Sequence, residues 1–210
     1  MTELILTFVG LILLGYFAGN ISFARIISKA IHSDITMLGS GNPGTMNMTR
    51  NYGWKIGLLT LFLDLLKATI PCLLARILGE HFFIDYTNIL VYTTGLAVVL
   101  GHDFPVFYKF RGGKGVACTL GIFAVLYPVY FGISLIVGLL LLIFVKIGSL
   151  TSLILVTGLS VVGIIFSKSY VEIILIAIIY ILCVFLHREN LVKMFTGKEN
   201  KVNLFKKRDK

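Results

Sequence analysis

The stretch VACTLGIFAVLYPVYFGISLIVGLLLLIFV, residues 116–145, contains no charged side chain over its whole length. A single helix of that length would measure about 45 Å, whereas the hydrocarbon core of a bilayer is about 30 Å thick. Basic residues flank the stretch on both sides: Lys109, Arg111, Lys114 and Lys146. Because lysine and arginine favour the cytoplasmic side of a membrane, we expect both ends there, so the stretch must cross twice. We predict the break at LYPVY, 126–130, because proline disfavours helix in the residue before it.

The composition indicates a membrane protein along the whole chain. Of 210 residues, 57% are hydrophobic and 14% are charged, against about 25% charged in soluble domains; the mean hydropathy is +0.94. The N-terminus lacks a basic region and a cleavage site, so we interpret it as a retained helix rather than a signal peptide. The prediction is an all-α integral membrane protein with seven transmembrane helices in a single domain, 1–210. Besides the two crossings within 116–145, apolar helices are predicted at about 4–27, 56–78, 87–103, 151–167 and 170–186.

The positive charge predicts the orientation. Of 19 lysines and arginines, all except Lys67, Arg76 and Lys168 lie in or beside the segments that this topology places inside. The N-terminus is therefore expected outside and the C-terminus in the cytoplasm. Residues 187–210 would form a basic cytoplasmic tail against anionic headgroups. The net charge of +9 then reflects membrane placement rather than nucleic-acid binding. The three cysteines fall in apolar segments and are interpreted as small buried hydrophobes, without a disulfide framework.

Every polar, glycine-rich stretch falls on the predicted inner side. The first, GSGNPGTMNMTR (39–50), is expected to be a loop because glycine and proline are the poorest helix formers. The outer connections are short and plain. One face is therefore predicted to carry the chemistry. The other three inner stretches are GHDFPVFYKFRGGKG (101–115), KIGSLTS (146–152) and HRENLVK (187–193).

These loops carry the donors that bind phosphate. Lys114 stands in a flexible RGGKG turn, and a helix starting near Val116 would aim its positive end at the same place. Arg50 supplies a planar fork for an anion. Neither a carboxylate pair nor a histidine–cysteine cluster accompanies them, so we predict an anion site without metal or cofactor, beside an apolar wall. Taken singly, these features also fit cytoplasmic anchors, and Ser149 and Ser152 fit helix caps.

Two other interpretations remain open at this point. Asp64 and Lys67 are three residues apart in a predicted membrane helix and are expected to pair, since an unpaired charge there is costly; a proton relay is the alternative. An anion transporter is the rival function, although transporter sites usually lie near the bilayer midplane between repeats, and no repeat is seen. A non-catalytic assembly subunit would not need several donor-rich loops on one face.

Three stretches give the chain a family resemblance. GSGNPGTMNMTR, GHDFPVFYKFRGGKGVA and HRENLVKMFTGKEN resemble the signature regions of the bacterial acyl-phosphate:glycerol-3-phosphate acyltransferases, the PlsY family, as do LFLDLLKA (61–68) and KIGSLTSL (146–153). The resemblance implies a multi-pass enzyme of the bacterial cytoplasmic membrane, with its active site facing the cytoplasm. It would move a fatty acyl group from acyl phosphate to the 1-hydroxyl of sn-glycerol 3-phosphate, giving lysophosphatidic acid and phosphate. We also expect a monomer, with room for a partner enzyme that supplies acyl phosphate.

The resemblance also assigns residues. Lys114, Ser40 and Arg50 would bind the phosphates and act in catalysis. By the same resemblance Ser149, Ser152, His187 and Asn190 would bind substrate. The residue types themselves add Asn42, Gly44, Asn47, His102, Gly112 and Gly113 as substrate-binding candidates. The sequence departs from the family's usual pattern at three places, which are Gly19-Asn20-Ile21-Ser22, Gly44-Thr45-Met46-Asn47 and Ala117-Cys118.

The identity of the base is open between two hypotheses. In the first, which the family is thought to use, the phosphate of glycerol 3-phosphate takes the proton from the attacking hydroxyl; its second pKa near 6 suits that task. In the second, Ser40 forms an acyl-enzyme with His102 or His187 as base.

Overall fold

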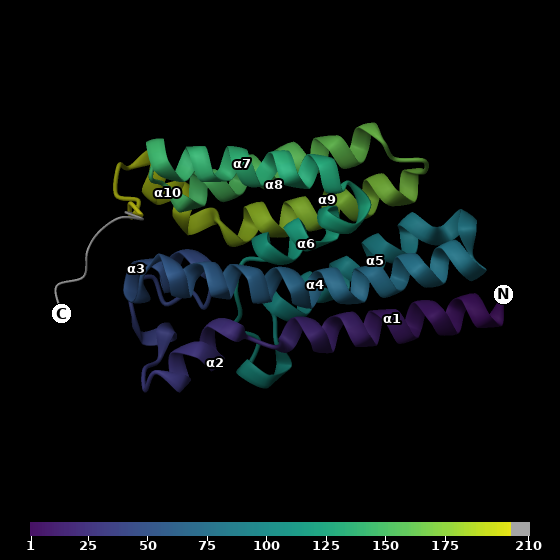
Figure 1. Cartoon of the computed structure of the whole chain (residues 1–210), viewed down its shortest axis with the longest axis horizontal. Coiled ribbons are helices and arrows are strands. Elements are labelled where there is room, and N and C mark those ends of the chain that lie inside the picture. Colours follow the sequence, from purple (N-terminus) through teal and green to yellow (C-terminus); the bar gives the residue numbers. More distant parts are fainter. Residues whose placement is uncertain (203–210) are drawn as a thin grey trace.

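The computed structural model describes residues 1–202, and it is helical almost throughout (Figure 1). One isolated β-bridge joins Ile147 to Lys201. The predicted all-α class is therefore confirmed. The helices are α1 (Thr2–Asn20), α2 (Phe23–Ala30), α3 (Thr45–Tyr52), α4 (Trp54–Phe82), α5 (Thr87–Asp103), α6 (Val116–Leu126), α7 (Pro128–Phe144), α8 (Gly148–Ile165), α9 (Tyr170–Leu186) and α10 (Arg188–Phe195), with short 3-10 helices at Ile35–Met37, Ile84–Tyr86 and Val106–Tyr108.

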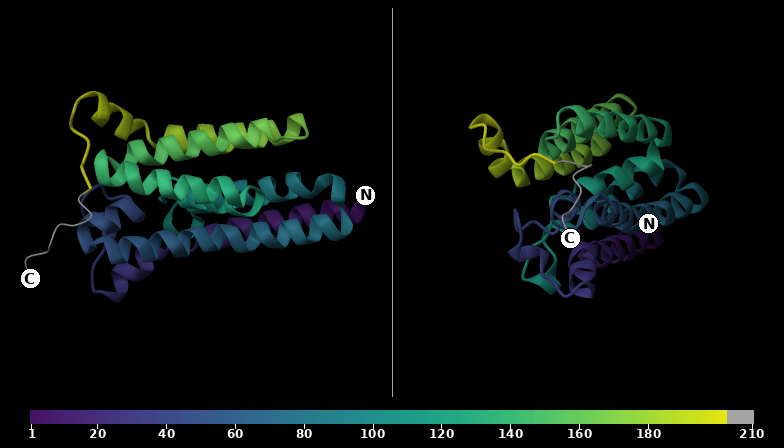
Figure 2. Two further views of the ribbon diagram at one scale, coloured as in Figure 1. Left: turned by 45° about the horizontal axis from the view of Figure 1, so that its top comes forward. Right: turned by 60° about the vertical axis from the view of Figure 1, so that its left-hand side comes forward.

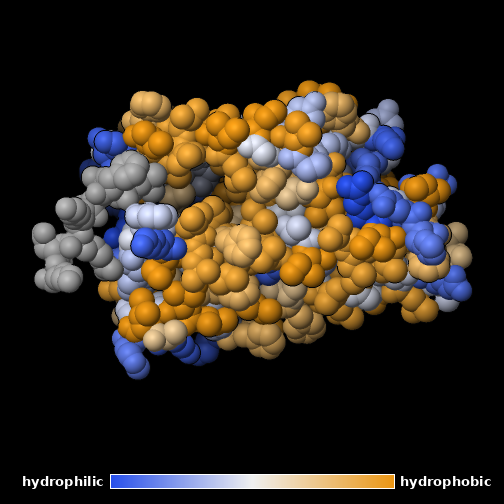
Figure 3. All heavy atoms as spheres, in the orientation of Figure 1, coloured by the Kyte–Doolittle hydropathy of each residue, from blue (hydrophilic) through white to orange (hydrophobic). Residues whose placement is uncertain are grey.

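Several of these helices are long and apolar enough to cross a membrane. Within the described chain they are Thr2–Ala30 (α1 with α2), α4, Ile84–Tyr108 (with α5) and α8. The α9–α10 pair, bent by 55°, raises the number from 4 to 5. Helices α6 and α7 are shorter apolar helices. Apolar side chains cover most of the face seen in Figure 3, and hydrophilic residues gather toward its two ends, as expected where a bilayer surrounds the middle.

The predicted break within 116–145 is confirmed. Helix α6 ends at Leu126, and α7 begins at Pro128, which is the helix position where proline costs nothing because its missing N–H would have no partner there. Helix α6 has only 11 residues and is about 16 Å long. It packs against α4, α5, α7 and α8, between the α1–α4–α5 layer and the α7–α9 layer (Figure 2).

Three local predictions differ from the structure. The predicted helix 4–27 is broken at Ile21 and Ser22, where both residues are extended. The second half of the predicted loop 39–50 is helix α3, because its glycines and proline all lie before Thr45 and the run to Tyr52 has none. Helix α8 begins at Gly148, three residues before its predicted start.

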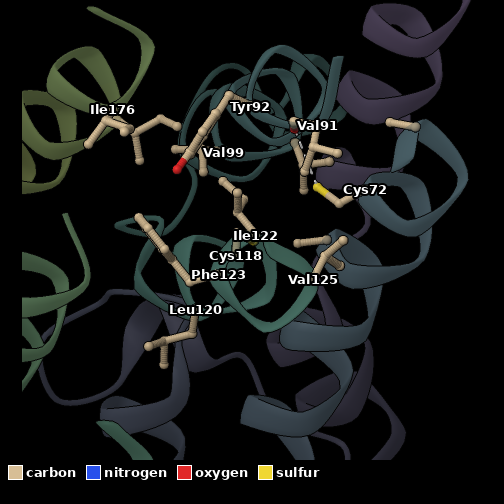
Figure 4. Packing of buried hydrophobic residues seen from close by; sticks show 14 of the residues in the cluster. Cys72, Val91, Tyr92, Val99, Cys118, Leu120, Ile122, Phe123, Val125 and Ile176 are labelled. Carbon is tan, nitrogen blue, oxygen red and sulfur yellow. Dashed lines mark hydrogen bonds between the residues drawn. The ribbon is translucent and has the colours of Figure 1, made fainter. Parts of the chain in front are cut away.

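Helix α5 is the most buried of the candidate spans. It packs against α1, and Gly19 and Gly101 allow the closest approach: a Cβ on either would overlap backbone atoms of the other helix, the small-residue contact typical of membrane helices. On its other side, the rings of Tyr92 and Phe123 meet edge to face at 6.3 Å. Figure 4 shows them beside Ile176 of α9. This core joins the two layers and fixes the frame of the cavity described next.

The polar segments gather at one end of the bundle. In Figure 1, α2, α3 and α10 lie at the end opposite the N-terminus. The loop 101–115 reaches the same end, because Arg25 of α2 donates to the carbonyl of Arg111 at 2.7 Å and stacks on Tyr108 at 4.6 Å. Cys72, Cys118 and Cys183 are buried free thiols.

Candidate functional site

A cavity of about 610 Å³ lies at the polar end of the bundle. One wall is apolar and comes from α4, α6, α7 and α8: Leu58, Leu61, Leu120, Leu135, Leu139, Leu142 and Leu155. The other wall is polar. It contains eleven of the predicted site residues: Ser40, Asn42, Gly44, Asn47, Arg50, His102, Lys114, Ser149, Ser152, His187 and Asn190. The cavity is thus suited to a ligand that is part anion and part hydrocarbon.

Several helices of the described chain begin at this cavity, among them α3, α6 and α8. Gly44 and Thr45 start α3, Gly115 and Val116 start α6, and Ser149 lies in the first turn of α8; all five line the cavity. The first amides of a helix lack intrahelical partners and carry the positive end of its dipole. The predicted helix start near Val116 is confirmed, and two more helices join it. The convergence of these helix N-termini favours the binding of an anion at the polar wall of the cavity.

The two cavity cations are only partly neutralised. Lys114 Nζ donates to Asn190 Oδ1. Arg50 Nη2 donates to the carbonyl of Asn200 at 3.1 Å and lies 4.0 Å from Glu199 Oε1, while Arg50 Nε has no hydrogen-bond partner among residues 1–202. Burial lowers the pKa of both Lys114 and Arg50 below their usual values. Charges held away from water interact more strongly with a bound anion.

Glu199 is a site residue that the sequence analysis missed. Its Oε1 accepts from Asn190 Nδ2 at 2.9 Å and faces Arg50, and only 2% of its side chain is exposed. The segment around it folds back over α3 and the start of α8: Val202 is buried, and its N–H donates to the carbonyl of Lys146 at 2.7 Å. We call residues 199–202 the return segment. Glu199 lies in HRENLVKMFTGKEN (187–200), one of the stretches that carry the family resemblance. That position is the signal in the sequence from which Glu199 could have been identified.

Part of the predicted basic tail, 187–210, is ordered by contacts with the bundle. Residues 188–195 form α10, and the return segment contacts Arg50 and Asn190. The cause is long-range: the Arg50–Asn200 hydrogen bond joins residues 150 positions apart. The remaining part of the predicted tail, 203–210, lies outside the described residues.

Asn47 lines the cavity, but its side chain is fully used by the protein. Its Nδ2 donates to the carbonyls of Ile35 at 3.2 Å and Leu38 at 2.9 Å. Its Oδ1 accepts from the backbone N–H of Ser40 at 3.2 Å and from Asn51 Nδ2 at 3.0 Å. An amide side chain has two donors and two main acceptor positions, so Asn47 shapes the loop that carries Ser40.

The two histidines of the cavity are held in different ways. His187 Nδ1 lies 2.8 Å from the carbonyl of Cys183; since a carbonyl only accepts, Nδ1 carries a proton there. His102 Nδ1 lies 2.8 Å from Lys67 Nζ. The predicted Asp64–Lys67 pair is confirmed at 2.8 Å, with both side chains buried.

Gly112 and Gly113 do not line the cavity but lie behind it. A Cβ on Gly113 would overlap the ring of His102, and one on Gly112 would overlap the carbonyl of His102. The N–H of Gly113 donates to that same carbonyl at 3.0 Å. The glycines therefore let the loop that ends at Lys114 pack closely on His102, whereas the sequence predicts them as part of the substrate-binding backbone.

Ser149, Thr151 and Ser152 all line the cavity. The interpretation of these serines as helix caps is wrong, because α8 starts earlier and its N-cap is Ile147. Thr151 Oγ1 donates back to the carbonyl of Ile147 at 3.1 Å, and Ser149 Oγ lies 3.7 Å from Met194 Sδ. Within residues 1–202 the hydroxyl of Ser149 therefore has a weak acceptor as its partner.

The sequence and the structure were compared with known proteins. Residues 9–197 match the family model described as glycerol-3-phosphate acyltransferase. The glycerol-3-phosphate acyltransferases of Thermotoga petrophila and Aquifex aeolicus are 39% and 38% identical, covering 93% and 91% of this chain and 96% and 97% of their own. The crystal structure of PlsY (YgiH), described as an integral membrane glycerol 3-phosphate acyltransferase in its glycerol 3-phosphate form, superposes with a TM-score of 0.85 at 34% identity, over 95% of this chain and 99% of that one. Its lysophosphatidic acid form gives 0.81. The chain belongs to the glycerol-3-phosphate acyltransferase (PlsY) family.

Proposed function

We propose that this protein transfers a fatty acyl group from acyl phosphate to the 1-hydroxyl of sn-glycerol 3-phosphate, releasing lysophosphatidic acid and inorganic phosphate. The observation that carries the proposal is one cavity with a cationic wall at one end and a leucine wall at the other. The related crystal structures, described as glycerol 3-phosphate and lysophosphatidic acid forms, support the acceptor and the product. A free soluble anion would not need the leucine wall.

The cations and helix ends are the proposed phosphate sites. Lys114 and Arg50 would neutralise the two phosphate groups, and the N-termini of α3, α6 and α8 would supply backbone donors. Ser40, whose loop is held by Asn47, would add a hydroxyl donor. The apolar wall would take the acyl chain, with burial of each methylene contributing about 0.8 kcal/mol.

The proposed chemistry is a direct transfer. The 1-hydroxyl oxygen attacks the acyl carbonyl carbon while its proton moves to the phosphate of glycerol 3-phosphate itself. The bond from the acyl carbon to the phosphate oxygen then breaks, and its electron pair leaves with inorganic phosphate. Donors at the polar end stabilise the developing charge without reorganisation. The proposed steps use the side-chain donors of the cavity and the substrate's own phosphate, and they call for no metal or cofactor.

The proposed setting is the bacterial cytoplasmic membrane, with seven crossings, the N-terminus outside and the cavity facing the cytoplasm. The basic residues support this orientation. Arg25 and Lys29 belong to α2, at the end of the bundle opposite the N-terminus (Figure 1), Lys55 to the first turn of α4, and Lys109 and Arg111 to the loop that Arg25 contacts. The α6–α7 hairpin returns the chain to the side from which it entered. We further propose that the protein acts as a monomer among membrane lipids, and that a separate enzyme supplies acyl phosphate.

The test is reconstitution of the reaction. Purified protein in nanodiscs is incubated with palmitoyl phosphate and glycerol 3-phosphate, without added metal or coenzyme A, and lysophosphatidic acid and phosphate are measured. We expect both products in equal amounts from the wild type and almost none from Lys114→Ala. Lys29→Ala, an exposed basic residue of α2, is the matched control and should keep full activity. Absence of product from folded wild-type protein would refute the proposal, and anion uptake into proteoliposomes would then support transport.

A further inference from the structure

Lys67 lies behind the cavity wall, on the membrane helix α4. Its Nζ is 2.8 Å from Asp64 Oδ1, 2.8 Å from His102 Nδ1 and 2.7 Å from the carbonyl of Ile21. Asp64 and His102 line the cavity, whereas only 3% of the Lys67 side chain is exposed. Lys67 therefore acts on the site indirectly, through its contacts with His102 and Asp64.

The three contacts determine where the proton of His102 lies. A lysine ammonium has three donors and no acceptor. The Ile21 carbonyl and His102 Nδ1 lie at hydrogen-bond distance from Nζ, and Asp64 Oδ1 forms an ion pair with it. If Nδ1 were protonated, its hydrogen would lie against a hydrogen of the Lys67 ammonium. His102 Nδ1 must therefore be the bare nitrogen, and the proton of the neutral ring must lie on Nε2.

The same ring supports the loop that carries Lys114. A Cβ on Gly113 would overlap Nε2, Cε1 and Cδ2 of His102, so the loop backbone lies directly against the imidazole ring. The N–H of Gly113 is also hydrogen-bonded to the His102 carbonyl at 3.0 Å. A rotation of the ring would push on Gly113, the residue immediately before Lys114.

We propose that Lys67 is a positioning residue for the acyl transfer: it fixes His102 as the Nε2–H tautomer, and thereby sets the ring that backs the Lys114 loop. In this arrangement the protonated Nε2 faces Gly113 and Nδ1 is occupied by Lys67, so His102 is not the base. His187 is held in the opposite tautomer by the Cys183 carbonyl, with its bare nitrogen at Nε2. The inference rests on the proposed function for its kinetic consequences, but the proton position can be measured without any activity.

The third contact gives Lys67 a further role. The Ile21 carbonyl lies at the break between α1 and α2, where the helical hydrogen-bond ladder is interrupted. A free carbonyl inside a bilayer needs a partner, and the ammonium supplies one. The α1–α2 break, the buried carboxylate of Asp64 and the histidine of the site are thus joined at one nitrogen atom.

The first experiment measures the tautomer directly. The full chain, labelled with ¹⁵N-histidine and held in nanodiscs at neutral pH, is examined by NMR for one-bond ¹⁵N–¹H coupling. The sequence has four histidines, so the His102 signals are identified by their loss in His102→Gln. We expect a proton on Nε2 and none on Nδ1. Lys67→Met should convert the ring to a mixture of tautomers, whereas Cys72→Ala, a buried change elsewhere on α4, should leave it unchanged. A proton on Nδ1 in the wild type would overturn the inference.

The second experiment is kinetic. Lys67→Met should lower kcat/KM by about 100-fold, the loss expected for an ångström-scale misplacement. Lys67→Met leaves the buried carboxylate of Asp64 without its ion-pair partner, which destabilises the fold. The double variant Asp64→Asn/Lys67→Met removes that carboxylate charge, and it should show a similar loss of kcat/KM at the wild-type expression level. His102→Gln, which keeps an N–H near Nε2, should exceed His102→Ala by about 5- to 10-fold, equivalent to one hydrogen bond. Equal inactivity of the two His102 variants would refute a role for the Nε2 proton in positioning the Lys114 loop.

The outcomes separate this inference from the proposed function. An active wild type in which His102 carries its proton on Nδ1 would refute the positioning role of Lys67 alone. An inactive wild type with the expected tautomer would refute the acyl transfer but leave the assigned proton position standing.

Discussion

Substituting Asn47 by alanine tests whether this residue binds substrate or shapes the loop. The structure gives its side chain four hydrogen bonds within residues 35–51. At about 1 kcal/mol net for each bond, Asn47→Ala removes about 4 kcal/mol of local stability. One factor of ten corresponds to about 1.4 kcal/mol, so opening of the loop should become up to about 700-fold more frequent, limited by the stability the loop has in the wild type.

The assay is amide hydrogen exchange, followed by mass spectrometry, on protein in nanodiscs without substrate. We expect faster exchange at Ser40 and its neighbours in Asn47→Ala, together with a fall in kcat/KM. Thr45→Ala is the matched control, because it removes a polar side chain from the same helix and cavity but no hydrogen bond of that side chain to the loop.

The refuting result is equally specific. If Asn47→Ala raises KM for glycerol 3-phosphate while exchange at 35–42 stays at the wild-type rate, Asn47 acts on the substrate and the argument from its four bonds is wrong. Asn47→Asp sharpens the test, since it keeps both acceptor positions but faces the Ile35 and Leu38 carbonyls with a carboxylate. It should resemble the alanine variant.

Three further predictions concern the charged and nucleophilic groups. Glu199→Ala should lower the thermal unfolding temperature in detergent more than Glu199→Gln, because only glutamine still accepts from Asn190; the difference should correspond to about 1–2 kcal/mol, and equal temperatures would contradict it. Since burial lowers the pKa of Lys114 and phosphate binding needs the ammonium, kcat/KM should fall as pH rises through a value below that of a free lysine, and Lys114→Arg should move this limb to higher pH; a limb at the same pH in both proteins would show that another group titrates. Hydroxylamine added to enzyme and acyl phosphate alone should trap no acyl group on Ser40, and a trapped adduct would replace direct transfer by an acyl-enzyme.

The bundle could be predicted because its determinants are local. The charges around 116–145 and one proline were enough to place the α6–α7 break within a residue of Tyr127. Asp64 and Lys67, one turn apart on a helix, could only pair or find another neighbour. These features depend on residues close together in the sequence and on the thickness of a bilayer, which is a general property of membranes.

The parts of the site that were missed depend on contacts across the chain. Nothing near Glu199 distinguishes it from a solvated acid in a basic tail; its role comes from Arg50 and Asn190, which approach it only in the folded bundle. Asn47 was correctly placed at the cavity, but its four partners decide what it does, and a motif does not show them. Gly113 likewise resembles a phosphate-binding glycine until the ring behind it is seen.

The return segment has a consequence for biosynthesis. In chain order, Glu199 and Val202 follow every helix of the described chain that could span the membrane. During translation the partners that Arg50 and Asn190 find in the return segment would therefore arrive only after those helices have been synthesised. A partly synthesised chain would hold Arg50 beside the lipid surface without the carboxylate that faces it in the finished fold. Acyl-transfer competence is thus tied to the order of synthesis, and a truncation before residue 199 should yield an inserted bundle with an incomplete site.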